Sequence, residues 1–345
     1  MQGPVAEVAD VGRVLLVKLS SLGDVIHGTA ALGPIRRMFP QAEITWVVDV
    51  RFADVPRHHP EVTRVIEARR FRTTPLRELR EIGQAAISLR REGVDLAIDI
   101  QGTFRSALWT YASGAPVKAG RGRPRPGWRR AVSPDLDRHA VRVIGDIMSE
   151  LGIAADDPRP ELYWPPSSEE TVTSLLTEFG LSGEPFVVFN PFSRWPSKEW
   201  PMERFRELAR RVGRECSAPV VVIGGPTEGG RAVTFAEACG PTRVFPVAGR
   251  TDLPGLFCLL KRARVVVSVD SGPMHAAAAV GTPVVALFGP TWPQRTGPWG
   301  PGHVILQGAK PRSHHAYRRA DTTLMKMLDV DLVFGALSGI LRDRK

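Results

Sequence analysis

Cysteine is scarce in this chain, which has three among 345 residues: Cys216, Cys239 and Cys258. They are too far apart to form a CxxC pair, and no cluster of Cys and His has the spacing of a zinc site. An odd number of separated cysteines is typical of reduced, mostly buried thiols in a cytosolic protein. The pattern therefore argues against both a disulfide framework and a zinc centre.

Long apolar runs are missing as well. No segment approaches the roughly 18 apolar residues that indicate a membrane-spanning helix. Residues 1–13 lack the basic start and apolar core of a secretory signal, so we expect none. The signatures GxxxxGK(S/T) and GxGxxG are absent after the first predicted strand, which argues against ATP or NAD in the N-terminal half.

Acidic residues are the less abundant charge, with 36 Asp and Glu against 46 Lys and Arg and a net charge of +10. A positive field favours nucleic acid, anionic lipid head groups or phosphorylated substrates as partners. The alternative is that the excess reflects only solubility or genome composition. No basic motif interleaved with aromatic residues supports nucleic-acid binding, and we expect none.

Apolar runs alternate with amphipathic segments along the whole chain. Strands are predicted over 13–19, 43–49, 62–67, 94–100, 185–190, 219–224, 244–247, 265–269 and 283–288. Such alternation, with helices between the strands, is typical of parallel, doubly wound sheets.

Two segments interrupt this alternation. Residues 155–168, rich in Pro, Asp and Ser, are the best linker candidate. Residues 118–130 are interpreted as a loop because Gly, Pro and Arg dominate them. We therefore predict two α/β domains, with a cleft where their strand ends face each other.

The most informative segment is 265–290, VVVSVDSGPMHAAAAVGTPVVALFGP. Its first strand is apolar throughout, as expected of a strand buried on both faces of a parallel sheet. Asp270, Ser271 and Gly272 follow at the carboxyl end, and Pro273 stands at a plausible first helical position. The helix start offers backbone N–H groups and a positive dipole end, which suit a phosphate or diphosphate.

The segment KLSSLGD, from Lys18 to Asp24, places two hydroxyls, a glycine and an acid at a second helix start. Asp24 is either a cap of that helix or a general base. Ser20 and Ser21 are likewise either caps or ligand contacts.

Three further segments carry polar groups with two possible roles each. Between Asn190 and Pro201, Ser193, Arg194 and Lys198 could neutralise a leaving diphosphate or belong to a solvated loop. Glu228 follows a strand and could accept hydrogen bonds from a ribose or form part of a tight turn. His275 on a packed helix is either structural or part of a site.

Taken together, four segments resemble the lipopolysaccharide heptosyltransferases, family nine of the glycosyltransferases. They are KLSSLGDVIHGTAAL, DIQGTFRSA, KEWPMERF and VVSVDSGPMHAAAAVGTPVVALFGPT, in this order between about residues 13 and 300. The resemblance implies a GT-B architecture, two Rossmann-like domains facing a central cleft. We assign the N-terminal, acceptor-binding domain to 1–165 and the C-terminal donor domain to 166–320. A C-terminal helix over 321–345 can pack back on the N-terminal domain.

The resemblance also implies the chemistry. Family members transfer L-glycero-D-manno-heptose from its ADP-activated form to the lipopolysaccharide inner core, invert the anomeric centre and need no metal. Asp24 matches the family's catalytic aspartate, which favours the base over the cap. The donor site matches Ser193, Lys198, Glu228, Asp270, Ser271, Gly272 and His275. No cofactor is expected, because the ADP-sugar is itself a substrate.

The acceptor site is assigned from three places in the sequence. Arg69, Arg70 and Arg72 resemble the RRWR cluster that handles the anionic acceptor in the first heptosyltransferase, with Phe71 in place of the tryptophan. Residues of the first and second motifs complete the set: Ser21, Gly23, Gln101 and Arg105.

The expected acceptor is a lipid-linked anionic glycan, Kdo-lipid A or heptosylated core. The enzyme is therefore expected in the cytoplasm, held peripherally on the anionic inner face of the bacterial inner membrane by arginines at 69–91 and the basic segment 118–130. Two alternatives remain open. One is a glycosyltransferase of the same fold with another nucleotide sugar or a non-core acceptor, and the other is a non-catalytic sugar-nucleotide-binding protein.

Overall fold

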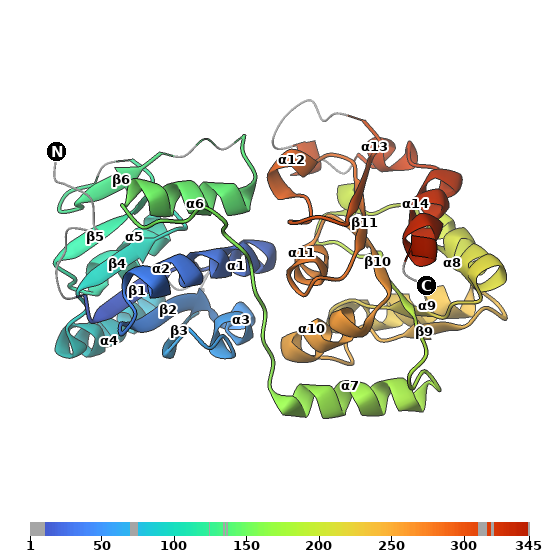
Figure 1. Ribbon diagram of the computed structural model, residues 1–345, viewed down its shortest axis with the longest axis horizontal. Coiled ribbons are helices and arrows are strands. Elements are labelled where there is room, and N and C mark those ends of the chain that lie inside the picture. Colours follow the sequence, from blue (N-terminus) through green and yellow to red (C-terminus); the bar gives the residue numbers. More distant parts are fainter. Residues whose placement is uncertain are drawn as a thin grey trace. The chain divides into compact units, whose positions relative to one another are not determined.

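The computed structural model describes residues 11–69, 75–123, 125–133, 135, 137–309, 316–318 and 321–343. The chain divides into two compact units, Met1–Tyr163 and Trp164–Lys345. In the described residues each unit has one six-stranded sheet, in which every strand pairs with its neighbours in parallel, with helices on both faces (Figure 1). The predicted fold class, two doubly wound α/β domains, is confirmed.

The sheet of the first unit has the strand order β3-β2-β1-β4-β5-β6. Its strands are β1 (Arg13–Val17), β2 (Glu43–Asp49), β3 (Arg64–Ala68), β4 (Leu96–Asp99), β5 (Val117–Arg121) and β6 (Arg130–Val132). The helices are α1 (Leu22–Gly28), α2 (Leu32–Met38), α3 (Asp54–Arg57), α4 (Pro75–Glu92), α5 (Phe104–Ala112) and α6 (Ala140–Glu150). Helices α4 and α5 pack on one face of the sheet, while α1 and α6 lie together on the other (Figure 1). Because the chain winds outward in both directions from β1 and β4, the topological switch point lies between these two strands.

The interpretation of residues 118–130 as a loop is wrong at both ends. β5 pairs in parallel with β4, and β6 pairs with β5 at the sheet edge. Gly120 makes this pairing possible, because its φ is 143° and a Cβ there would lie 2.2 Å from the Asp99 carbonyl oxygen. Glycine is typical of loops, but Gly120 is required here because the backbones of β4 and β5 come very close at this position.

The second unit repeats the arrangement of the first. Its sheet has the order β12-β11-β10-β7-β8-β9, which is the order of the first sheet when the strands of each unit are counted from its start. The strands are β7 (Val187–Asn190), β8 (Val220–Val222), β9 (Val244–Pro246), β10 (Val265–Val269), β11 (Val284–Phe288) and β12 (Val304–Gln307). The helices are α7 (Pro166–Glu178), α8 (Met202–Cys216), α9 (Gly229–Glu237), α10 (Leu253–Arg262), α11 (Gly272–Ala279), α12 (Pro293–Thr296), α13 (Thr323–Lys326) and α14 (Val330–Asp343). The switch point here lies between β7 and β10.

Two helices of the second unit differ from the sequence interpretation. α7 overlaps the end of the predicted linker over 166–168 and buries Val172, Leu175 and Leu176 while packing on α10. α14 packs on α8, and its Val333, Phe334 and Leu337 belong to the core of the second unit. The packing on the N-terminal domain that we expected for this helix stays a prediction.

Candidate active site

Asp24 lies in the first turn of α1, the helix that follows the carboxyl end of β1 after a short turn. Its Oδ2 accepts hydrogen bonds from the Ser21 backbone N–H at 2.9 Å and the Ser21 hydroxyl at 2.8 Å. Its Oδ1 lies 3.7 Å from Lys18 Nζ, and 47% of its side chain is exposed. The carboxylate therefore caps α1 and is accessible at the same time, so the two roles weighed from the sequence are compatible. Gly23 is buried beside it in the same turn.

Lys18 is a site residue that the sequence reasoning missed. It is the first residue after β1, and its side chain is only 5% exposed. Burial lowers the pKa of the Lys18 ammonium, and the positive charge of Arg121 lowers it further. The negative charges of Asp24 and Asp99 act in the opposite direction. The signal was present in the sequence as a lysine within an otherwise apolar run, RVLLVKL.

Asp99 ends the neighbouring strand β4 and is fully buried. It accepts hydrogen bonds from the Gln101 N–H at 2.9 Å, the Gly102 N–H at 2.9 Å and the Ser106 hydroxyl at 2.8 Å. Burial raises the pKa of Asp99, and these hydrogen bonds oppose the rise. The network fixes the turn between β4 and α5 at the switch point.

Gln101 has a supporting position in this turn. Its Oε1 accepts from the backbone N–H groups of Leu19 at 3.2 Å and Ser20 at 3.3 Å. The side chain therefore joins the β4–α5 turn to the β1–α1 turn. Its predicted contact with an acceptor stays a prediction.

Arginines gather at the carboxyl edge of β2, β3 and β4. Arg105, on the first turn of α5, donates from Nη2 to the Arg69 carbonyl at 3.0 Å. Arg51 forks onto Asp49 with two bonds of 2.9 Å and is itself 58% exposed. Burial acts to raise the pKa of Asp49, but the Arg51 bonds outweigh it and the net shift is downward. Arg69 and Arg105 are thus brought together, whereas Arg70 and Arg72 lie outside the described residues. Their predicted contact with an acceptor stays a prediction.

In the second unit, Lys198 and Asp270 form a close ion pair. Lys198 Nζ lies 2.7 Å from Asp270 Oδ2, and their side chains are 15% and 6% exposed. The ammonium also lies 5.2 Å from the centre of the Tyr317 ring. Lys198 ends the 3-10 turn η4 (Pro196–Lys198) after β7, and Asp270 follows β10 directly, so both lie at the switch point of the second sheet.

Asn190, the last residue of β7, is a second residue that we missed. Its Nδ2 donates to the hydroxyls of Ser268 and Ser271, both at 2.7 Å. Asn190 binds the Ser271 hydroxyl, and the Ser271 side chain makes no capping hydrogen bond to α11. Helix α11 begins at Gly272, two residues after Asp270, so its first N–H groups lie at the same strand ends as the Lys198–Asp270 pair. His275 is buried one turn further along α11.

The loop after β7 and the turn after β8 supply the remaining predicted donor residues. The Ser193 N–H donates to Glu199 Oε1 at 3.0 Å, and its hydroxyl accepts from the Trp195 N–H at 3.2 Å. Glu228 ends the 3-10 turn η5 (Pro226–Glu228) and accepts from the Thr227 hydroxyl at 3.0 Å. Ser193 thus shapes the loop that carries Lys198, and Glu228 is half-buried in the turn after β8.

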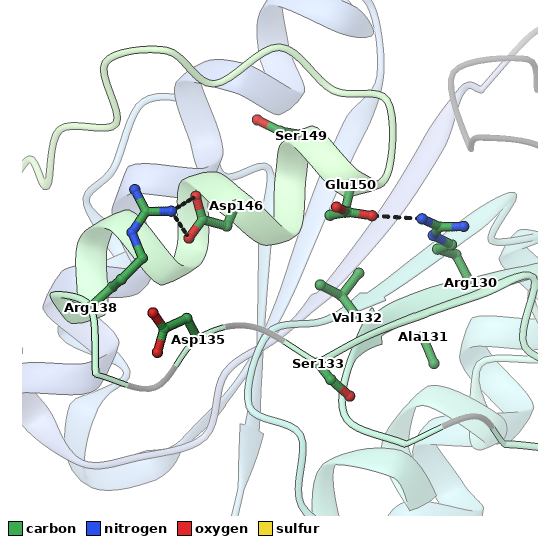
Figure 2. Close-up of a pocket in the computed structure, with 9 residues that line it drawn as sticks. All are labelled: Arg130, Ala131, Val132, Ser133, Asp135, Arg138, Asp146, Ser149 and Glu150. Carbon is green, nitrogen blue, oxygen red and sulfur yellow. Dashed lines mark hydrogen bonds and ion pairs between the residues drawn. The ribbon is translucent and has the colours of Figure 1, made fainter.

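A separate hollow of about 710 Å³ lies between β6 and α6 of the first unit (Figure 2). Its charged side chains pair with each other, Arg130 with Glu150 at 2.6 Å and Arg138 with Asp146 at 2.7 Å. Its lining residues include none of the predicted site residues. In the described part of the chain, no group of three or more His, Cys, Asp or Glu has an arrangement that could hold a metal ion.

Comparison with known proteins adds independent findings. The model of the family described as glycosyltransferase family 9 (heptosyltransferase) matches residues 82–326. Lipopolysaccharide heptosyltransferase 1 of Pseudomonas aeruginosa is 35% identical over 314 residues, which are 85% of this chain and 83% of that protein.

Solved structures match over nearly the whole chain. The glycosyl transferase family 9 protein from Veillonella parvula has a TM-score of 0.89 at 22% identity and covers 97% of this chain and 99% of its own. The structure of the E. coli heptosyltransferase WaaC with ADP-2-deoxy-2-fluoro heptose has a TM-score of 0.71 at 26% identity and covers 96% and 100%. The predicted GT-B architecture is confirmed by these matches.

Proposed function

The chain belongs to glycosyltransferase family 9, the heptosyltransferases, and we propose that it transfers heptose from ADP-L-glycero-D-manno-heptose to the lipopolysaccharide inner core with inversion. The observation that carries the donor class is the nearly buried Lys198 cation beside Asp270 and the start of α11. A diphosphate is the ligand that such a cation and helix start favour. The sugar and the acceptor follow from the relatives, which are lipopolysaccharide heptosyltransferases.

On the donor side, the residues stabilise the leaving group. As the bond from the anomeric carbon to the β-phosphate oxygen breaks, negative charge accumulates on that phosphate. Lys198 neutralises the charge by donating to the phosphate oxygens, and the N–H groups at the start of α11 add their dipole. Because these groups are fixed by Asp270 and Asn190 before the donor binds, little reorganisation is needed in the transition state.

On the acceptor side, Asp24 is the general base. The acceptor hydroxyl oxygen forms the new bond to the anomeric carbon, its proton passes to the Asp24 carboxylate, and the electron pair of the broken bond leaves with ADP. Arg69 and Arg105 provide positive charge for an anionic glycan at the same sheet edge. No residue forms a covalent intermediate in this single displacement, and no metal enters it.

The test is a product assay with purified protein, ADP-heptose and either Kdo-lipid A or heptosylated core, followed by mass spectrometry. A gain of one heptose on either acceptor is expected, and Asp24→Asn should lower turnover by about 10²–10⁴-fold. The panel also includes ADP-glucose and UDP-sugars. Transfer from one of these but not from ADP-heptose would favour the same fold with another donor, and no transfer from any would favour a binding protein.

We also propose that the enzyme works while bound peripherally to the anionic cytoplasmic membrane surface. Among the described residues no helix is long and apolar enough to cross a bilayer. Helix α4 exposes Leu79 by 51% and Ile87 by 57%, next to exposed Arg80, Arg90 and Arg91. An apolar pair flanked by cations is the composition of a helix that lies on an anionic interface, where each arginine contributes about 1 kcal/mol.

Vesicle co-sedimentation tests this proposal. Binding is expected to phosphatidylcholine vesicles that contain phosphatidylglycerol and not to phosphatidylcholine alone, and it should weaken with added salt. Ile87→Glu should reduce binding, whereas Leu332→Glu, on the exposed face of α14 with 48% exposure, is the matched control. Equal binding to neutral and anionic vesicles would contradict the proposal.

A further inference from the structure

We propose that Lys18 is a positioning residue, whose buried ammonium keeps the Asp24 carboxylate charged and turned towards the acceptor hydroxyl. The inference rests on the proposed function, because it deepens the role of Asp24 as the base. Lys18 itself touches no substrate in this account and acts through Asp24 alone.

The buried Lys18 is held at its backbone and at the base of its side chain. The Lys18 backbone carbonyl accepts from the Trp46 indole N–H at 3.1 Å. Its stem lies against Gly28, where an added Cβ would be 3.2 Å from Lys18 Cγ and 3.1 Å from the Trp46 ring. The ammonium lies 3.7 Å from Asp24 Oδ1, and its side chain is only 5% exposed.

Lys18 and Ser21 divide the two carboxylate oxygens between them. Ser21 engages Oδ2 with its N–H and hydroxyl, and Lys18 faces Oδ1 from the buried side. An ionised carboxylate has about four lone-pair positions, and 47% of the Asp24 side chain is exposed, where a substrate hydroxyl can reach it. Contacts from two directions, those of Ser21 and that of Lys18, restrain the orientation of the carboxylate.

Charged groups of both signs lie around Lys18. Asp24 and Asp99 face it with negative charge, and Arg121 with positive charge. Arg125 approaches Asp99, with Nη1 3.9 Å from Oδ2. When Asp24 accepts the proton, Lys18 loses the counter-charge that lies 3.7 Å from its ammonium. A buried cation without its counter-charge is unfavourable, so Lys18 also favours the release of that proton after each turnover.

The test compares the pH dependence of kcat/KM for wild type, Lys18→Met and Lys18→Arg. Loss of the nearby positive charge should move the acidic limb of Lys18→Met to higher pH by about 1–3 units, whereas Lys18→Arg keeps the charge and should stay near wild type. His27 on α1 and His139 on α6, whose rings lie 5.4 Å apart, are also close to this turn and are present in every variant. Lys326→Met, at an exposed lysine of α13, is the control with an unchanged profile.

A second comparison separates this inference from the proposed function. Asp24→Asn should be nearly inactive, and adding Lys18→Met to it should cost less than two-fold more, because Lys18 acts through Asp24. Full activity of Asp24→Asn would overturn the proposed base and leave donor binding untouched. An inactive Asp24→Asn with an unshifted acidic limb in folded Lys18→Met would overturn the inference about Lys18 alone. Lys18→Gln, which retains a donor on a long stem, serves if the methionine variant does not fold.

Discussion

Replacing Lys198 with methionine should weaken ADP binding without unfolding the second unit. The side chain is 15% exposed and its Nζ lies 2.7 Å from Asp270 Oδ2. An ammonium has three N–H groups, so it can keep its bond to Asp270 and still donate to a diphosphate. Methionine retains most of the stem and removes only the charge and the donors.

Two magnitudes follow from this geometry. A hydrogen bond to a charged group contributes about 1.5–3 kcal/mol, so the Kd for ADP should rise roughly 10- to 150-fold. The Asp270 carboxylate, 6% exposed, loses its partner at the same time, and breaking a buried pair costs roughly 3 kcal/mol of unfolding free energy. Binding and stability should therefore fall together in Lys198→Met.

The double variant Lys198→Met with Asp270→Asn separates the two effects. It removes the unpaired charge, so most of the unfolding free energy should return while the ADP affinity stays low. Calorimetric titration with ADP and chemical denaturation measure the two quantities. Lys261→Met is the matched control, because that lysine on α10 of the same unit donates to the Val280 carbonyl at 2.9 Å. A folded Lys198→Met that binds ADP within two-fold of wild type would refute the assignment of the diphosphate site.

Three further predictions concern stability. Burial, opposed by Glu161 and Glu61, lowers the pKa of His59 to about 4 from an ordinary value of 6.5. The unfolded chain therefore takes up a proton first, and the unfolding free energy should fall by up to about 3 kcal/mol as the pH drops from 6.5 to 4; His59→Phe should flatten this slope in denaturant melts. Gly249→Ala, where φ is 78° and a Cβ would meet Pro226 Cα at 2.9 Å, should destabilise the protein by at least about 1 kcal/mol more than Gly240→Ala, where φ is 70° and nothing lies within 4 Å; paired thermal melts give the difference. Asn190→Ala should cost about 1–3 kcal/mol, because two serine hydroxyls lose a buried donor, and should lower ADP affinity in the same calorimetric assay.

The sequence predicted the buried strands well, because parallel strands covered on both faces need uninterrupted apolar runs. The predicted strands over 265–269 and 43–49 are β10 and β2. β5, inside the sheet, and the edge strand β6 were missed because Lys, Gly and Arg interrupt their short apolar runs. α7 was missed because its three buried apolar side chains stand among Ser, Thr and Glu, a composition that also suits a linker.

The candidate site could be placed from the sequence but not assembled. The motifs predicted which strand ends carry Asp24, Lys198 and Asp270. Asp270 follows β10 directly, whereas Asp24 lies in α1 after β1 and Lys198 in η4 after β7. The partners could not be predicted, since Lys18 meets Asp99 and Arg121 only through the order of β1, β4 and β5 in the sheet. The Gln101 side chain could bind an acceptor or support a neighbouring turn. Only the structure shows that its amide oxygen accepts from the backbone N–H groups of the β1–α1 turn.

The common strand order of the two sheets has an evolutionary and practical consequence. Duplication of a half-length ancestor yields such a repeat, and the copies then diverge at equivalent places. Lys18 follows β1, the first strand of one unit, and Asn190 ends β7, the first strand of the other. Asp99 ends β4 and Asp270 follows β10, the fourth strands of the two units. Each unit can therefore serve as a reference for the other. Residues at equivalent strand positions of the two units can be compared and exchanged by mutation.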